Sequence, residues 1–318
     1  MRPLFLGLLC SCAAAAPSVR FNPGALVAPA PPRPSAGCAA RVPAVQGDRT
    51  LTSGGRTRRF RLVIPARAES GPAPLVLNLH GLVETASLQE TYSDMNAKAA
   101  ARGMITVYPQ GAGNSWNAGS CCGRAQAEGI DDVRFLRQLV GEIESEACID
   151  RNRVYATGMS NGAMMVYRLA CEASDLFAAV APVDGVEAVP RCTPRRPVPV
   201  LSFNGTSDRL VRWESGRFGL GSAQETAARL RRRYGCGEPR IAWQHGDAIC
   251  EDAPGCAVPA ISCRIEGGGH TWPGAVPFPF LGHTSSDLDA TATALDFFLD
   301  HGVRQASGFG LRASGQKP

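Results

Sequence analysis

Three features of the sequence predict an α/β fold in which a mostly parallel sheet is covered by helices on both faces. Short apolar runs alternate with helical segments along most of the 318 residues, as expected of strands joined by crossover helices. The runs lack period-two polarity, which indicates strands buried on both faces. The composition, 44% hydrophobic and 19% charged, is typical of a globular chain with a large core and excludes a disordered one.

The N-terminus predicts export. A charged start at Met1-Arg2 is followed by a short apolar run, Leu4 to Leu9, and by the small residues Ala13-Ala14-Ala15. We expect residues 1–15 to be a signal peptide and the protein to be secreted, extracellular or periplasmic. The run is too short to cross a bilayer. Lipoprotein processing at Cys12 is the alternative, which would give a lipid anchor.

Cysteine usage supports an oxidising compartment. The chain has 12 cysteines, and removal of residues 1–15 takes Cys10 and Cys12 with it, so 12 − 2 = 10 remain, an even number that could pair fully. None of the spacings pairs with histidines in a zinc pattern. Connectivity does not follow from sequence. Local pairing suggests Cys250–Cys256, Cys236–Cys263 and Cys171–Cys192, with Cys38, Cys121, Cys122 and Cys148 pairing among themselves.

Chain order predicts one catalytic domain. We expect a Pro/Ala-rich flexible leader over 16–47, the domain over 48–302 and a disordered tail over 303–318. A hairpin with a Ser53-Gly54-Gly55 turn opens the domain. The apolar runs predict strands at 74–79, 104–109, 153–157, 177–183, 198–203 and 260–265, and helices are expected at 92–102, after the cap Asp131, at 161–171 and at 289–300.

Charge argues against a nucleic-acid partner. The net charge is +5, and the basic residues are scattered except for the run Arg229 to Arg233. That run has no aromatic interleaving and no recognition motif around it, so we interpret it as the solvated face of a helix.

The stretch Gly158-Met159-Ser160-Asn161-Gly162 lies between a predicted strand and a predicted helix. Gly-x-Ser-x-Gly is the pattern of a nucleophile elbow, a sharp turn that lifts the serine Oγ clear of the backbone. The pattern also occurs by chance in chains rich in small residues. A catalytic serine therefore needs a base, an acid and oxyanion donors elsewhere in the chain.

His270 is the candidate base, because it stands in a glycine-rich loop directly after the last predicted strand. Asp208 is the candidate acid, in a turn two strands beyond the elbow. Asp184, which also follows a strand, is its rival. The order Ser160, Asp208, His270 is that of α/β-hydrolases.

The backbone N–H of Asn161 and that of Leu82 are the candidate oxyanion donors, and neighbouring His80 is expected to shape the Leu82 loop. Trp116 and Trp272 are candidate walls for an apolar or aromatic acyl group. Ordinary loop packing is the alternative for both tryptophans.

Several of these motifs together resemble the secreted polyhydroxybutyrate depolymerase-like esterases, which are similar to feruloyl and acetylxylan esterases of carbohydrate esterase family 1. The resemblance covers roughly 48–302 and rests on Leu79-His80-Gly81, on 116–123, on 131–133, on 158–165 and on 267–274. Asn204 departs from it, because the family often has histidine at that point of the acid loop.

The resemblance implies an α/β-hydrolase with Ser160, Asp208 and His270 as its triad and with no metal or organic cofactor. The implied activity is hydrolysis of a carboxylic ester through an acyl-enzyme, on hydroxyalkanoate esters of the poly-3-hydroxybutyrate type. The alternative is a feruloyl or acetylxylan esterase acting on plant cell-wall polysaccharide. A non-catalytic polymer-binding protein on the same scaffold and a serine peptidase are rival classes, and the oligomeric state stays open.

Overall fold

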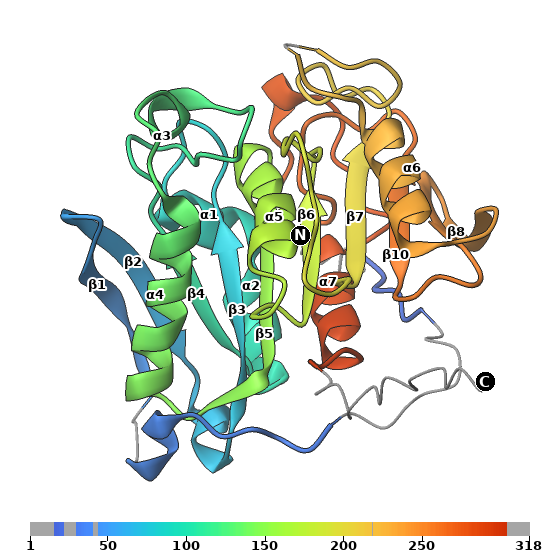
Figure 1. Cartoon of the computed structure of the whole chain (residues 1–318). Coiled ribbons are helices and arrows are strands. Elements are labelled where there is room, and N and C mark those ends of the chain that lie inside the picture. Colours follow the sequence, from blue (N-terminus) through green and yellow to red (C-terminus); the bar gives the residue numbers. More distant parts are fainter. Residues whose placement is uncertain (1–15, 22–29, 41–43, 218, 304–318) are drawn as a thin grey trace, which may run out of the picture.

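The computed structural model describes residues 16–21, 30–40, 44–217 and 219–303. The expected signal peptide, the cysteine of the lipoprotein alternative and the expected tail beyond residue 303 lie outside these ranges. Figure 1 shows one twisted sheet with helices in front of it and behind it.

The sheet has ten strands in the order β1-β2-β4-β3-β5-β6-β7-β10-β9-β8. The six strands from β4 to β10 run parallel, and antiparallel pairs extend the sheet at both edges. The central strand β3 is buried along its whole length, as its unbroken apolar run predicts. The strands are β1 (Val45–Ser53), β2 (Arg56–Ile64), β3 (Ala73–Leu79), β4 (Ile105–Pro109), β5 (Ile149–Met159), β6 (Ala179–Val183), β7 (Val200–Gly205), β8 (Arg240–His245), β9 (Ala248–Asp252) and β10 (Ala260–Ile265).

Helices cover both faces of the sheet, each over its own apolar cluster. The side chains of α4, α5 and α6 pack into one cluster, and those of α2 and α7 pack into the other on the opposite face (Figure 1). The helices are α1 (Ala86–Ser93), α2 (Met95–Ala101), α3 (Gly123–Ala127), α4 (Asp132–Glu146), α5 (Asn161–Glu172), α6 (Ala223–Tyr234) and α7 (Ala290–Leu299), with short 3₁₀ turns at η1 (Ala36–Ala39), η2 (Ala66–Ser70) and η3 (Pro279–Leu281). The fold is therefore the predicted one.

Local sequence signals account for many element ends. Gly54 and Gly55 have φ of 56° and 71°, the positive values that a two-residue hairpin turn requires. Asp131 caps α4 as predicted, because its Oδ1 accepts the N–H of Arg134 at 2.9 Å. The structure adds α1 and the β8–β9 hairpin, which were not predicted. It also starts α2 later than the single helix expected at 92–102.

The basic run lies on α6, but it is not simply a solvated face. Arg233 donates two hydrogen bonds, at 2.7 and 2.9 Å, to the carboxylate of Glu187, a residue that is itself buried. Arg229 Nε lies 3.6 Å from the same carboxylate. A charged pair of this kind compensates for the burial of Glu187, and it ties α6 to the segment after β6.

Five disulfides join the cysteines of the described ranges: Cys38–Cys148, Cys121–Cys122, Cys171–Cys192, Cys236–Cys256 and Cys250–Cys263. The pairing of Cys171 with Cys192 is confirmed. The expected Cys250–Cys256 and Cys236–Cys263 pairs are wrong. The reason is register: Cys250 on β9 lies directly opposite Cys263 on β10 in the antiparallel ladder, which leaves Cys236 and Cys256 to each other.

The described parts of the leader pack against the domain, in contrast to the flexible leader expected from its composition. Ser35 donates its N–H to the carbonyl of Ile149 at 2.9 Å, and Cys38 is bonded to Cys148. Farther upstream, the N–H of Val19 donates to Thr293 Oγ1 on α7 at 3.1 Å. A disulfide and long-range hydrogen bonds thus fix the described parts of this proline-rich leader, which include the 3₁₀ turn η1. Across the described ranges, we find no helix with the length and apolar character needed to cross a membrane.

Candidate active site

Ser160 stands on a strained turn between β5 and α5. Its φ of 56° and ψ of −119° place a non-glycine residue in a region that side chains rarely adopt. Its N–H donates to the carbonyl of Val183 at 2.9 Å, which ties the turn to the end of β6. A Cβ on Gly158 or Gly162 would lie 2.5 or 2.3 Å from the carbonyl oxygen of Leu79, so only glycine fits at either position. The local geometry is that of a nucleophile elbow.

Asp208 and His270 meet at the carboxyl ends of β7 and β10, which are neighbours in the sheet. His270 Nδ1 lies 2.6 Å from Asp208 Oδ2, and both side chains are buried. The other Asp208 oxygen, Oδ1, accepts the N–H groups of Leu210 at 2.7 Å and Val211 at 2.9 Å. These amides fix the carboxylate, so it can hold Nδ1 protonated and leave Nε2 free to act as a base.

Further carboxyl groups surround the imidazole. Burial lowers the pKa of His270, but the Asp208 hydrogen bond and the carboxyl groups of Asp184 and Glu84 raise this pKa, which ends above its ordinary value. Burial also raises the pKa of Glu84, whose Oε2 accepts the N–H of Gly81 at 2.7 Å. Sequence reasoning missed Glu84. Its position three residues after a glycine turn is a weak signal for such a contact.

Asp184, Asp208 and His270 also form the group of potential metal ligands found in the described ranges, with ligand atoms within 4.8 Å of one another. The hydrogen bonds already described use His270 Nδ1 and both oxygens of Asp208. We therefore interpret the cluster as an acid–base unit.

The candidate oxyanion donors lie on either side of the elbow. Asn161 is the first residue of α5, and the first N–H groups of a helix have no partner within the helix. On the other side, Gly81 N–H donates to Glu84, and Val83 N–H donates to the carbonyl of Asn114 at 2.8 Å. The amides before and after Leu82 are thus both held, which fixes the peptide of Leu82 between them.

His80 shapes this loop as a neutral ring. Burial lowers the pKa of His80 to about 4. Its Nδ1 lies 2.7 Å from the carbonyl of Gly81, to which it donates, and its Nε2 accepts the N–H of Gly111 at 2.9 Å. Both ring nitrogens are occupied, in agreement with the role expected for this histidine.

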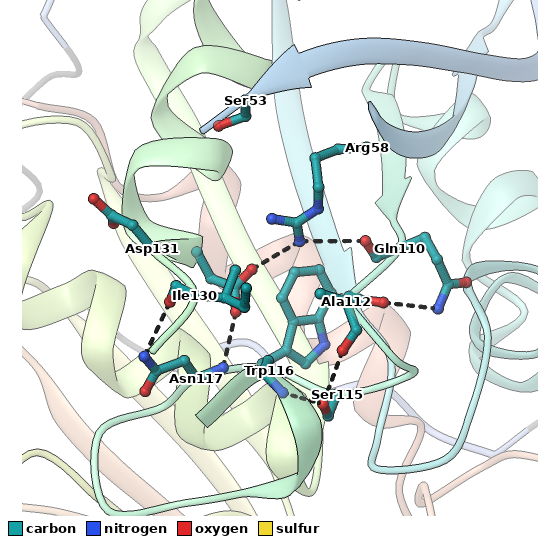
Figure 2. A network of polar contacts seen from close by, with 12 residues as sticks. Ser53, Arg58, Gln110, Ala112, Ser115, Trp116, Asn117, Ile130 and Asp131 are labelled. Carbon is teal, nitrogen blue, oxygen red and sulfur yellow. Dashed lines mark hydrogen bonds and ion pairs between the residues drawn. The ribbon is translucent and has the colours of Figure 1, made fainter. Parts of the chain in front are cut away.

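The Asn161 side chain has a role that sequence reasoning did not foresee. Its Oδ1 accepts the N–H of Trp116 at 2.6 Å, and its Nδ2 donates to the Trp116 carbonyl at 2.9 Å. The next residue, Asn117, donates its N–H to the carboxylate of Asp132 at 2.8 Å, and Arg58 donates to the same carboxylate at 2.7 Å. Figure 2 shows the part of this network around Arg58 and Asn117, where Asn117 Nδ2 also donates to the carbonyl of Ile130 at 2.9 Å.

The two candidate tryptophans are buried, with exposed fractions of 0% for Trp116 and 1% for Trp272. Trp116 Nε1 donates to the carbonyl of His80 at 2.9 Å, and Trp272 Nε1 donates to Thr291 Oγ1 at 2.9 Å. Such placement corresponds to the loop-packing alternative. Neither indole offers exposed surface to a substrate, although both support backbone segments next to candidate catalytic residues.

A cavity of about 880 Å³ opens beside the turn of the candidate acid. Its walls come from 206–209, 212–215, Arg217, Arg264 and Glu266, and its lining is mostly polar. Neither Ser160 nor His270 belongs to this lining, so we do not place the ester in this cavity.

The fold and the residues at its strand ends define the chain as an α/β-hydrolase. Solved structures agree at the level of the fold. An acetyl xylan esterase from Aspergillus awamori superposes with a TM-score of 0.54 at 18% identity, covering 71% of this chain and 94% of that one. An S-formylglutathione hydrolase from Agrobacterium tumefaciens superposes with a TM-score of 0.53 at 14% identity, covering 86% and 97%.

Sequence comparison is more specific. Residues 59–190 match the family "Esterase PHB depolymerase". The putative esterase NocK of Nocardia uniformis subsp. tsuyamanensis is 34% identical over 93% of this chain and 97% of its own length. Feruloyl esterase B of Piromyces equi is 34% identical over 62% of this chain, which spans 39% of that protein. Poly(3-hydroxyalkanoate) depolymerase C of Paucimonas lemoignei is 35% identical over 36% of this chain and 28% of its own length. The chain belongs to this esterase family and is a carboxylic ester hydrolase.

Proposed function

We propose that Ser160, His270 and Asp208 hydrolyse a carboxylic ester in two steps. The hydrogen bond between His270 and Asp208 at the ends of β10 and β7, together with a serine held at positive φ at the end of β5, carries this proposal. Ser160 Oγ attacks the ester carbonyl and passes its proton to His270 Nε2. The alcohol leaves with that proton, and the acyl group stays on the serine. Water then gives a proton to His270 and attacks the acyl-enzyme, and Ser160 recovers the proton as the acid is released.

In this proposal, the N–H groups of Asn161 and Leu82 receive the negative charge that develops on the carbonyl oxygen. Preorganised donors of this kind are each worth about 3 kcal/mol in the transition state. The position of Asn161 at the start of α5 and the two held amides around Leu82 support these roles.

We further propose that the substrate is a hydroxyalkanoate ester of the poly-3-hydroxybutyrate type and that the protein acts outside the cytoplasm. Of the eight large apolar side chains exposed in the described ranges, six lie on the segments that follow β3, β7 and β10: Leu82, Val83, Leu210, Val276, Phe278 and Phe280. These are the segments that carry Leu82, Asp208 and His270. Exposed apolar side chains gathered on functional loops favour an aliphatic polyester over a hydrated polysaccharide. The five disulfides support export.

Substitution of the nucleophile tests the chemistry. Ser160→Ala should abolish hydrolysis of p-nitrophenyl acetate and leave the melting temperature within a few degrees of the parent protein. Ser145→Ala is the matched control, because Ser145 lies exposed near the end of α4 and should keep full activity. Full activity of the Ser160→Ala variant would refute the proposed nucleophile.

Parallel assays test the substrate. The purified protein is offered soluble hydroxybutyrate oligomers, polymer granules, methyl ferulate and acetylated xylan. We expect the highest kcat/KM on hydroxybutyrate esters. Phe280, 96% exposed, gives a sharper variant. Phe280→Ser should slow granule hydrolysis and leave p-nitrophenyl acetate hydrolysis unchanged. Preference for methyl ferulate or acetylated xylan would transfer the assignment to the cell-wall alternative.

A further inference from the structure

Two carboxyl groups converge on one imidazole in this site. Asp184 follows β6 and Asp208 follows β7, and because these strands are parallel neighbours their carboxyl ends lie side by side. Ligand atoms of Asp184, Asp208 and His270 all lie within 4.8 Å of one another. Asp208 makes the hydrogen bond to His270 Nδ1, and Asp184 stands next to that bond without taking part in it.

Burial and hydrogen bonds fix both the backbone and one carboxyl oxygen of Asp184. It is 1% exposed, and its φ of 47° is a left-handed conformation that few side chains adopt. Its N–H donates to the carbonyl of Phe203 at 2.8 Å, and its Oδ1 accepts the N–H of Gly205 at 3.0 Å. Its second oxygen, Oδ2, makes no hydrogen bond of good geometry in the described part of the chain, although the Thr271 amide lies near enough to lower the pKa of this carboxyl group.

The charges around Asp184 explain why it does not compete with Asp208. Burial and the neighbouring Asp208 carboxylate raise the pKa of Asp184 well above its ordinary value, while His270 and the amides of Gly205 and Thr271 lower this pKa. Glu84 is a further acidic group that raises the pKa of the imidazole. Two carboxyl groups this close do not both ionise readily. Asp208 accepts two amides on Oδ1 and makes the hydrogen bond to His270 with Oδ2.

We propose that Asp184 is a second positioning residue for His270, a carboxyl group that takes over the imidazole when the Asp208 carboxylate is lost. The inference rests on the proposed function, because it requires His270 to be the base that serves Ser160. In an Asp208→Asn variant the competing negative charge is gone. Asp184 then ionises, and its carboxylate stabilises the imidazolium that forms as the serine loses its proton.

Four proteins test the idea: the parent, Asp208→Asn, Asp184→Asn and the double variant, each assayed for kcat/KM on p-nitrophenyl acetate from pH 5 to 9. Asparagine keeps an oxygen for the amides of Leu210 and Val211, so the acid loop retains its capping bonds. Loss of the only acid in a triad costs on the order of 10⁴-fold in rate. With Asp184 in reserve, Asp208→Asn should lose about 10²-fold, the double variant about 10⁴-fold, and Asp184→Asn less than about 10-fold.

The pH profile separates positioning from mere structural support. Activity of both variants should rise with pH as His270 loses its proton, and the midpoint should lie at higher pH in Asp208→Asn than in the double variant, because the Asp184 carboxylate raises the pKa of His270. Equal rates for Asp208→Asn and the double variant would overturn the inference, as would an Asp184→Asn loss as large as that of Asp208→Asn. Circular dichroism and melting temperature show whether each variant is folded. Ser160→Ala keeps the two proposals apart. If it is inactive and the Asp208→Asn and double-variant rates coincide, the reserve role fails alone, whereas an active Ser160→Ala refutes the triad itself.

Discussion

Replacing Arg58 by methionine should destabilise the protein far more than a surface arginine substitution would. Arg58 and Asp132 are 4% and 0% exposed and lie 2.7 Å apart, nitrogen to oxygen. The guanidinium carbon also stands 3.8 Å from the centre of the Phe135 ring. Arg58→Met keeps an unbranched apolar stem but removes the guanidinium, which leaves the carboxylate of Asp132 with the N–H of Asn117 as its remaining hydrogen bond. Breaking a buried pair from one side costs about 3–5 kcal/mol.

A double-mutant cycle gives the prediction its sharpest form. The double variant Arg58→Met/Asp132→Leu lacks both charges. It leaves mainly the N–H of Asn117 without a partner, which lowers the free energy of unfolding by about 1–3 kcal/mol. The double variant should therefore be more stable than either single variant. Urea unfolding followed by tryptophan fluorescence measures all four proteins.

The pH dependence of the Arg58→Met effect provides a second readout. Burial raises the pKa of Asp132, and Arg58 lowers this pKa. Without Arg58 the folded-state pKa rises further above the unfolded one. The folded variant then binds more protons between the two values, so its free energy of unfolding falls as pH rises. The difference in free energy of unfolding between Arg58→Met and the parent protein should be largest at neutral pH and should shrink towards pH 4. A decrease of less than about 1 kcal/mol in the free energy of unfolding of Arg58→Met would refute the reasoning. Additive decreases in the double-mutant cycle would refute it as well.

Further predictions concern pH, cross-linking and packing. Because His270 must be neutral to act as a base and its pKa is raised, kcat/KM should fall below an apparent pKa above 6.5, and a flat profile between pH 4 and 8 would contradict this role. His80 has a folded pKa of about 4 against 6.5 unfolded, so it contributes about 3 kcal/mol that is present above pH 6.5 and lost as pH falls to 4, which urea midpoints across that range would reveal. The pH range in which His80 titrates therefore lies below the range in which His270 titrates. The Cys38–Cys148 bond spans 110 residues, so its replacement by two alanines should cost about 4–5 kcal/mol in denaturant unfolding, and a loss under about 1 kcal/mol would contradict the loop-entropy estimate. Gly162→Ala puts a methyl group 2.3 Å from a β3 carbonyl and should abolish activity or folding, whereas Gly141→Ala on α4 meets no atom within 4 Å and should be tolerated.

The parallel strands were predictable because burial on both faces leaves a continuous apolar run, as in β3 and β6. The helix α1 gives no such signal. Its Gln89 and Ser93 side chains bond to Asn78 on β3, so tertiary contacts maintain a polar helix whose local sequence signal is the N-cap Thr85. The hairpin strand β8 is mostly exposed, and the local signal for its pairing with β9 is the two-residue turn Gly246-Asp247, in which Gly246 has a φ of 51°.

The candidate site, like the fold, could be predicted from the sequence only in part. Chain order and turn chemistry point to Ser160, His270 and Asp208, since each follows a strand with glycine or small polar residues around it. The presence of Asp184 within 4.8 Å of both Asp208 and His270 depends on which strands are neighbours, and one sequence does not contain that information. The tryptophans show a second limit of sequence-based prediction. A large aromatic residue in a loop near the candidate catalytic residues gives the same sequence pattern whether its side chain faces the substrate or the interior.

The contact of Gly158 and Gly162 with the carbonyl of Leu79 bears on how this fold can change over evolutionary time. The turn that carries the serine and the strand that leads into the Leu82 loop touch through backbone atoms, so neither can shift without the other. Variation that alters the acyl or alcohol preference is therefore confined to segments outside this contact. The exposed residues Phe278 and Phe280 lie on such a segment, where we expect substitution to leave the contact between the Ser160 turn and β3 unchanged.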